Sequence, residues 1–172
     1  KPGVTGAITV PRWTPFGRLD GLEYLTTEAV TLPTGVDTVE VDALQGVAVT
    51  RTIQPEEFAI IDWSRRPKVS IGANICAGSV SMWSGDPAVY WTETKTYFRV
   101  RATDRVFRLE LNGDDDTVNL ALGDGVYGAA APTEAVAIEF IRTSGAAGNG
   151  GSGAVTVVPD AYKALITCTN ID

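Results

Sequence analysis

The side chains that most often carry chemistry are scarce in this sequence. None of its 172 residues is a histidine, which removes the commonest general base and the commonest metal ligand. Serine–histidine and cysteine–histidine catalysis within the chain are therefore excluded. The two cysteines, Cys76 and Cys168, lie far apart among apolar or strand-like neighbours. We expect buried free thiols rather than a disulfide, and a zinc site would have to add carboxylates to these two sulfurs.

Carboxylates are the remaining candidates for catalysis or cation binding. Asp114, Asp115 and Asp116 offer the oxygen ligands that calcium takes, but their spacing does not match an EF-hand loop. We therefore interpret them as an acidic, solvated turn. Asp124, between two glycines, could be catalytic, although a turn in which its side chain bonds nearby backbone is the simpler interpretation. Any two of the 21 acidic residues could form a glycosidase pair, but no pattern indicates one.

Aromatic and basic residues offer two possible binding surfaces. The tryptophans could form a platform for sugars, although large aromatic side chains are more often core residues or interface anchors. The tryptophans are Trp13, Trp63, Trp83 and Trp91. Four arginines could form a basic stripe, with the first two on one face of a strand; they are Arg99, Arg101, Arg105 and Arg108. Because Glu110 is close and the chain is acidic, a solvated or partner-facing strand is favoured over a nucleic-acid site.

The overall composition narrows the class of protein. A formal net charge of −7 and a pI of about 4.6 argue against binding to the backbone of nucleic acids, which needs a basic surface. Hydrophobic residues make up 44% and charged residues 20%, as in ordinary globular domains. No apolar run approaches the roughly 20 residues of a membrane helix, so no membrane span is expected. The chain begins at Lys1 without a methionine, and we expect an excised or processed piece.

The elements that must position these residues are predicted to be short strands. Alternation of apolar and polar residues, with turn residues between the runs, favours strands and shows no long helical period. The ten predicted strands cover residues 6–10, 22–27, 36–41, 47–53, 96–102, 107–111, 117–122, 135–142, 154–158 and 165–169. Residues 30–32 extend the strand at 22–27 or pair with it, and residues 69–71 are a short apolar run. One helical turn is predicted at Pro55–Glu57, and Asn112-Gly113 predicts a hairpin. The pattern indicates an all-β protein, an antiparallel sandwich or barrel-like domain with long glycine-rich loops and little helix.

The sequence indicates the boundary between domains less clearly than it indicates the strands. Valine- and threonine-rich strands stop near Gln54, which predicts an N-terminal β-segment over residues 1–53 and a main β-domain over 54–172, or one continuous domain. Within the second part, residues 120–158 alternate apolar strands with glycine-rich turns, which predicts a hairpin with elaborate turns. The glycine loop over residues 145–153 lacks the Gly-Lys-Ser/Thr ending of a phosphate loop and precedes a strand.

This stretch resembles the baseplate J-like family, the wedge proteins of contractile phage tails and related injection systems. That family carries an apolar strand ending in Phe-Gly-Asp-Gly, then a glycine, a proline-containing turn, a strand, and a loop reading Gly-Ala-Ala-Gly-Asn. The matching residues here are Leu122, Gly123, Asp124, Gly125, Gly128, Pro132, the strand over 136–142, Gly145, Ala146, Ala147, Gly148 and Asn149. Leu122 replaces the phenylalanine. Weaker likeness extends over residues 21–28, 33–35, 91, 106–110 and 167–170.

The resemblance implies a structural subunit of a tail baseplate in the virion, assembled in the host cytoplasm. Such a subunit would hold neighbouring baseplate and tail proteins around the tail hub and rearrange when the sheath contracts. No catalytic site, cofactor, metal or small-molecule substrate is then expected, and the eight glycine, aspartate, proline and asparagine residues of the motif would form structural turns. Because the family continues into a further α+β region, we expect this chain to be the β-rich core of a longer wedge protein. A receptor- or carbohydrate-binding β-module of a virion is the alternative, and a glycoside hydrolase a distant third.

Overall fold

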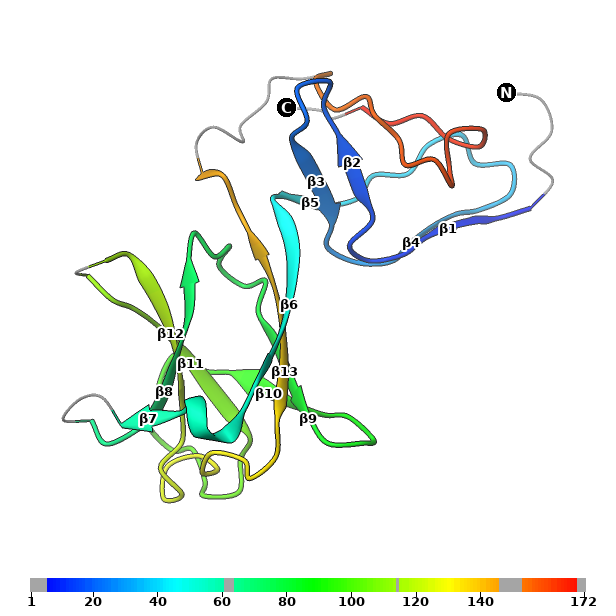
Figure 1. Ribbon diagram of the computed structural model, residues 1–172. Coiled ribbons are helices and arrows are strands. Elements are labelled where there is room, and N and C mark those ends of the chain that lie inside the picture. Colours follow the sequence, from blue (N-terminus) through cyan, green and yellow to red (C-terminus); the bar gives the residue numbers. More distant parts are fainter. Residues whose placement is uncertain (1–5, 61–63, 114, 146–152, 170–172) are drawn as a thin grey trace. The chain divides into compact units, whose positions relative to one another are not determined.

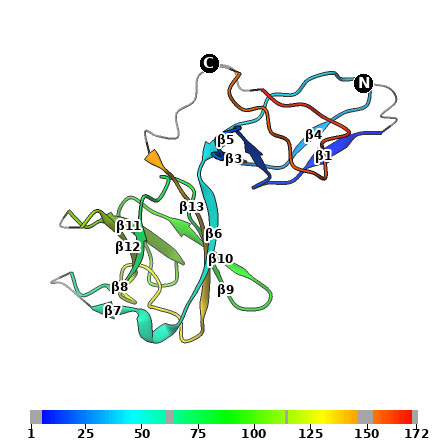
Figure 2. The same ribbon diagram turned by 45° about the horizontal axis from the view of Figure 1, so that its top comes forward.

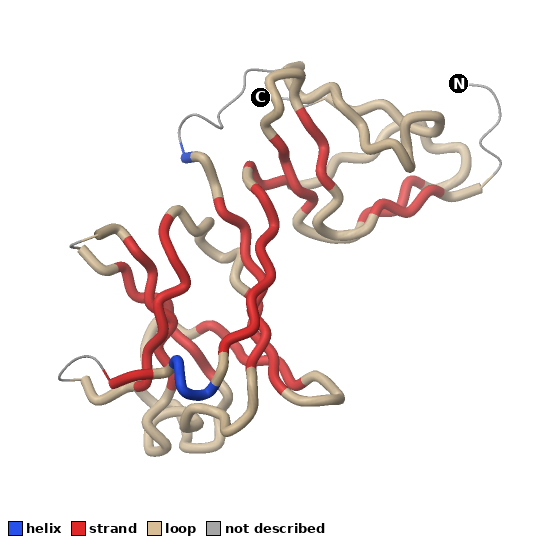
Figure 3. Tube along the Cα trace, in the orientation of Figure 1, coloured by secondary structure: helices blue, strands red, loops and turns tan. Residues whose placement is uncertain are grey.

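The computed structural model describes residues 6–60, 64–113, 115–145 and 153–169, and in these ranges the protein is almost entirely β (Figures 1 and 3). The named helical element is the single turn η1 (Pro55–Glu57), as predicted. The all-β prediction is therefore confirmed. No helix in these ranges is long and apolar enough to cross a membrane.

The contacts within the chain divide it into two units. One unit is residues 49–142, and the other joins residues 1–48 to residues 143–172. The boundary predicted from the sequence at residue 54 is close to the first division, whereas the second one, after Arg142, was not anticipated.

The unit of residues 49–142 is built on an eight-stranded sheet, whose first strand begins two residues earlier. Its strands are β6 (Val47–Ile53), β7 (Ala59–Ile60), β8 (Pro67–Ala73), β9 (Ser81–Ser84), β10 (Val89–Glu93), β11 (Val106–Leu111), β12 (Thr117–Leu122) and β13 (Val136–Arg142). Their order in the sheet is β6-β13-β9-β10-β11-β12-β8-β7. The neighbours with a defined register pair antiparallel, apart from the parallel pair β10 and β11.

This sheet curls around its core, so that strands far apart in the order come together. Arg51 on β6 donates a hydrogen bond of 2.8 Å to the carbonyl of Ser70 on β8, and it pairs with Glu57 of η1. The core includes Ile53, Phe107 and Phe140, each at most 1% exposed. A fully buried side chain of this size contributes about 1.5–3 kcal/mol relative to an exposed one.

The hairpin of β11 and β12 forms as predicted. Leu109 pairs with Leu120 and Phe107 with Leu122, which places the alternating apolar side chains of both strands toward the core. Asn112 closes the turn by donating its backbone N–H to the carbonyl of Thr117 at 2.8 Å.

The second unit contains two small sheets. β1 (Ile8–Val10) pairs with β4 (Val30–Leu32), and β3 (Glu23–Thr26) lies between β2 (Pro15–Gly17) and β5 (Ala43–Gln45). Leu25 and Thr26 of β3 are buried; the Thr26 hydroxyl accepts from the Thr14 N–H at 3.1 Å and donates to the Pro11 carbonyl at 2.8 Å.

Two predicted strands are wrong because the chain turns or lacks a partner there. Residues 36–41 form no strand, and Val36 and Val39 are 46% and 45% exposed. Residues 96–102 lie in the loop between β10 and β11, where Arg99 adopts a φ of +65° and Val100 N–H donates to the Tyr97 carbonyl at 3.2 Å. A strand cannot continue through such a turn.

Two predicted strands near the end of the chain are also wrong. Among the described residues, 154–158 form one isolated bridge, between Val157 and Gly17. The predicted hairpin is absent because β13 lies between β6 and β9, which occupy both of its edges. Residues 165–169 form no strand; Leu165 and Ile166 both donate their N–H groups to the Tyr162 carbonyl, which keeps the backbone in turns.

Candidate functional site

The turn after β12 is organised by Asp124. Its Oδ1 accepts hydrogen bonds from the N–H groups of Val126 at 2.9 Å and Tyr127 at 2.7 Å, and its Oδ2 lies 3.5 Å from the guanidinium of Arg66. The bond from Tyr127, the bond from Val126 and the charge of Arg66 hold the pKa of Asp124 below its usual value. The carboxylate stays ionised near neutral pH, where it accepts hydrogen bonds and orders the turn.

The glycines of the same turn pack backbone against backbone. A Cβ placed on Gly123 would lie 2.2 Å from the carbonyl carbon of Gly128, so no larger residue fits without moving the chain. Gly125, with a φ of +82°, donates its N–H to the Gly128 carbonyl at 3.1 Å. Pro132 follows, half-buried, between this turn and β13.

Arg66 connects three separate parts of its unit. Its guanidinium lies 3.7 Å from the centroid of the Tyr97 ring and donates to the Tyr127 carbonyl at 3.0 Å. Tyr97 is 8% exposed and donates its hydroxyl to the Ala121 carbonyl at 2.8 Å. Burial raises the pKa of Tyr97 to about 12, against the smaller opposing effect of Arg66. These contacts join the segment before β8, the loop before β11 and the end of β12.

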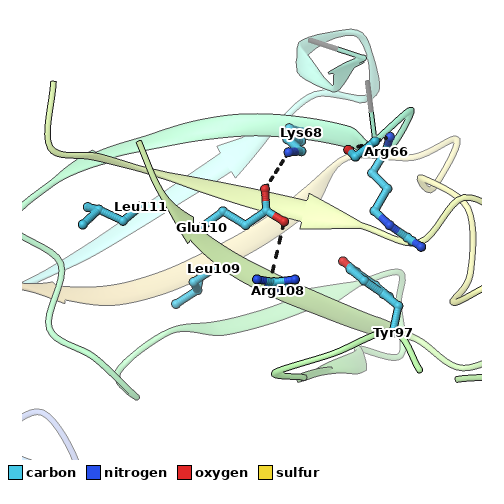
Figure 4. Close-up of a pocket in the computed structure, with 8 residues that line it drawn as sticks. Arg66, Lys68, Tyr97, Arg108, Leu109, Glu110 and Leu111 are labelled. Carbon is cyan, nitrogen blue, oxygen red and sulfur yellow. Dashed lines mark hydrogen bonds and ion pairs between the residues drawn. The ribbon is translucent and has the colours of Figure 1, made fainter. Parts of the chain in front are cut away.

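A basic depression of about 630 Å³ lies beside this network (Figure 4). Its lining is Ser64, Arg66, Lys68, Tyr97, Arg108, Leu109, Glu110 and Leu111. Glu110 Oε2 lies 2.5 Å from Lys68 Nζ, and its Oε1 lies 3.9 Å from Arg108 Nε. The side chain of Lys68 is only 5% exposed, so the ion pair with Glu110 offsets the cost of burying its charge. Arg66 and Arg108 leave the depression with a net positive lining.

The acidic turn between β11 and β12 is explained by its own hydrogen bonds. Asp115 Oδ1 accepts from the hydroxyl of Thr117 at 2.6 Å and from its N–H at 3.1 Å, and both bonds hold the pKa of Asp115 below its usual value. Asp114 lies outside the described residues. Within the part of the chain that is described, no three Cys, Asp or Glu side chains gather closely enough to hold a metal ion.

Trp83 and Trp91, the tryptophans described in the unit of residues 49–142, point to opposite faces of the sheet. Trp91 is 6% exposed and donates its Nε1–H to Ser84 Oγ at 3.2 Å, whereas Trp83 pairs across β9 and β10 with Tyr90, their rings 5.9 Å apart. Successive strand residues face opposite sides, so Trp91 and Tyr90 point away from each other. Trp13 belongs to the other unit and lies under Arg12, and Trp63 lies outside the described residues.

The remaining residues singled out from the sequence are the glycines and the asparagine of the loop after β13 and the two cysteines. Gly145, in the unit of the termini, has a φ of +61° and donates its N–H to Thr143 Oγ1 at 3.0 Å. Gly148 and Asn149 lie outside the described residues. Cys76 and Cys168 are free thiols, half-buried rather than buried, and burial raises the pKa of Cys168.

Sequence reasoning missed Arg66, Tyr97 and Lys68. Arg66 adjoins Pro67 and Tyr97 stands in a run that alternates like a strand, so neither position carries a distinguishing signal. Only the folded chain brings them to Asp124 and Glu110. No protein-family model matches the chain, and no curated protein matches it.

Proposed function

We propose that this chain is a structural β-module that joins neighbouring subunits of a contractile-tail baseplate. The observation that supports the proposal most is the construction of the turn that resembles the baseplate J-like motif. Gly123 is packed too closely for any side chain, Gly128 has a φ of +92° that favours glycine, and Asp124 directs both carboxylate oxygens to groups of its own unit. These three residues of the motif thus serve the fold, as expected of a structural subunit.

The surface around this turn supports the role in joining subunits. Phe98, Val126 and Tyr127 are 73%, 64% and 52% exposed, and arginines flank them. Exposed aromatic residues and arginines are enriched in protein–protein interfaces.

A carbohydrate-binding module is the second candidate, because one observation favours it. Tyr90 is 67% exposed and forms a tilted pair with the half-buried Trp83 on β9 and β10. Such a pair offers an aromatic surface to a sugar ring.

Particles assembled in cells that lack this chain distinguish the two functions. The structural proposal predicts tails that fail to assemble a baseplate, seen by negative-stain electron microscopy. The carbohydrate-binding alternative predicts complete tails that no longer adsorb to cells. Complete tails in the absence of the chain would therefore overturn the structural proposal.

A further inference from the structure

Two exposed surfaces of this chain complement each other in charge and in apolar character. The first, which we call the arginine face, lies on the unit of residues 49–142 and consists of Phe98, Arg99, Arg101, Arg105, Val126 and Tyr127. The second, which we call the acidic segment, is residues 36–42 of the other unit. The alternating sequence predicts strands over residues 36–41 of the acidic segment and over residues 96–102, which include Phe98, Arg99 and Arg101, and the structure has no strand at either place.

The arginine face is formed by two loops that are bonded to each other. The loop between β10 and β11 and the loop between β12 and β13 lie at the same end of the sheet (Figures 1 and 2). Gly128 N–H donates to the Arg101 carbonyl at 3.2 Å, and Ala129 N–H donates to the Asp104 carbonyl at 2.8 Å. Below them, Arg66 bridges the Tyr97 ring and the Tyr127 carbonyl. These bonds hold the two loops in a defined surface.

The charge of this face is opposite to that of the whole chain. Residues 99–108 contain four arginines and one acidic residue in a chain whose net charge is −7. That acidic residue, Asp104, turns its Oδ2 to the Arg101 N–H at 2.8 Å. Arg99, Arg101 and Arg105 are exposed beside Phe98, and the Arg99 guanidinium lies 5.2 Å from the Phe98 ring centroid. The face therefore presents apolar side chains among cations.

The acidic segment presents apolar side chains among anions. It reads Val36-Asp37-Thr38-Val39-Glu40-Val41-Asp42, with three valines, three acidic residues and no lysine or arginine. All of it except Val41 is exposed, and it belongs to no strand. The Asp42 carbonyl accepts from the N–H and the hydroxyl of Thr27 at 3.0 and 3.1 Å, which anchors one end to β3.

We infer that the arginine face binds the acidic segment of a second copy of this chain. Arginines meet Asp37, Glu40 and Asp42, while Phe98, Val126 and Tyr127 cover the valines. Because the two surfaces differ, the contact is heterologous and joins copies head to tail. A nucleic-acid partner is disfavoured, since the net charge of −7 repels phosphates and the face exposes apolar side chains at its centre. This inference rests on the proposed function and deepens it by naming a partner.

Light scattering of the whole chain at rising concentration and low salt tests the contact. The face variant reverses two charges, Arg99→Glu with Arg101→Glu, and the segment variant reverses two others, Asp37→Lys with Glu40→Lys. Matched controls reverse exposed charges elsewhere: Arg12→Glu with Lys163→Glu, and Glu28→Lys with Glu56→Lys. Thermal unfolding verifies that each variant is folded, and Arg101→Gln replaces the face variant if that one unfolds.

We expect the parent chain and both controls to gain mass with concentration, less so in high salt, and the two test variants to remain monomeric. Mixing the two test variants restores association, because the face variant keeps an intact acidic segment and the segment variant keeps an intact arginine face. A parent that stays monomeric at millimolar concentration, test variants that associate like the parent, or a mixture that stays monomeric would each overturn the inference. The assembly of particles in cells that lack the chain tests the proposed function separately. The proposed function and the inferred contact between copies can therefore fail independently.

Discussion

At the scale of single residues, the turn after β12 combines steric and electrostatic constraints. Gly123 gives the room for two backbone segments to touch, and Asp124 uses its charge to hold the following N–H groups. Arg66 then connects this turn to Tyr97. Steric fit and hydrogen bonding can be separated by substituting each residue alone.

Gly123→Ala tests the steric constraint. The new methyl group would overlap the backbone of Gly128, which no side-chain rotation relieves, so we expect a loss of about 2–3 kcal/mol in the free energy of unfolding. Gly113→Ala is the matched control: no heavy atom lies within 4 Å of the place its methyl group would take, and its φ is not positive, so a change below about 0.5 kcal/mol is expected. Urea unfolding of both variants measures the difference, and equal effects would contradict the packing described.

The pH dependence of stability tests the role of the Asp124 charge. Its pKa is lower in the folded chain than in the unfolded one, so its ionisation stabilises the fold above the unfolded value of about 3.9. That contribution is lost as the pH falls through the folded pKa. Asp124→Asn should therefore be less stable than the parent at pH 7, and urea unfolding at each pH should show the difference shrinking as the pH falls through the lowered pKa of the folded chain. A constant difference at every pH would exclude the charge as the cause.

At the scale of elements, an alternating sequence predicts a strand correctly only where the folded chain supplies a partner strand and a core for it. β11 and β12 were predicted because Asn112-Gly113 joins two runs whose apolar residues pair across the strands and reach the core. Residues 36–41 alternate equally well, yet no strand pairs with them, and Arg99 breaks the run at 96–102 with a positive φ. The partner of a strand can lie far away in the sequence, where a local pattern gives no sign of it. β13 pairs in this way with β9 and not with the nearby residues 154–158.

The residues of the candidate site likewise divide into those that neighbouring sequence predicts and those that it does not. The Asp124 turn could be predicted because its flanking glycines are next to it in the sequence. Arg66 and Tyr97 could not, because the fold alone brings them to that turn.

Arg51 tests how the curled sheet is held together. It links β6 to the Ser70 carbonyl on β8 and to Glu57, so Arg51→Ala should cost about 1 kcal/mol in unfolding free energy and speed amide hydrogen exchange on β7 and β8. Thr52→Ala, an exposed neighbour on the same strand, is the control and should stay within about 0.5 kcal/mol. Unchanged exchange on β7 and β8 in Arg51→Ala would show that this contact does not join the strands.

At the scale of the whole molecule, one unit is continuous in sequence and has its own core. All twelve buried residues of the main hydrophobic cluster lie within residues 49–142. We therefore expect a chain of residues 49–142 to fold alone and to unfold cooperatively, with the fluorescence of its three tryptophans and the far-ultraviolet circular dichroism changing together. Non-coincident transitions, or a chain without β-structure, would show that residues outside this unit are needed for it to fold.

The position of this chain in the particle tests most directly whether it is, as we propose, a structural component of a contractile-tail baseplate. If the proposal holds, electron cryo-microscopy of contractile tails from the source of this chain should resolve density for the eight-stranded sheet of residues 49–142 in a ring around the tail hub. Backbone density for the close approach of Gly123 to Gly128 and side-chain density for Trp91 beside Ser84 would identify it. Density for the sheet only at fibre tips, or its absence from the tail, would contradict the account.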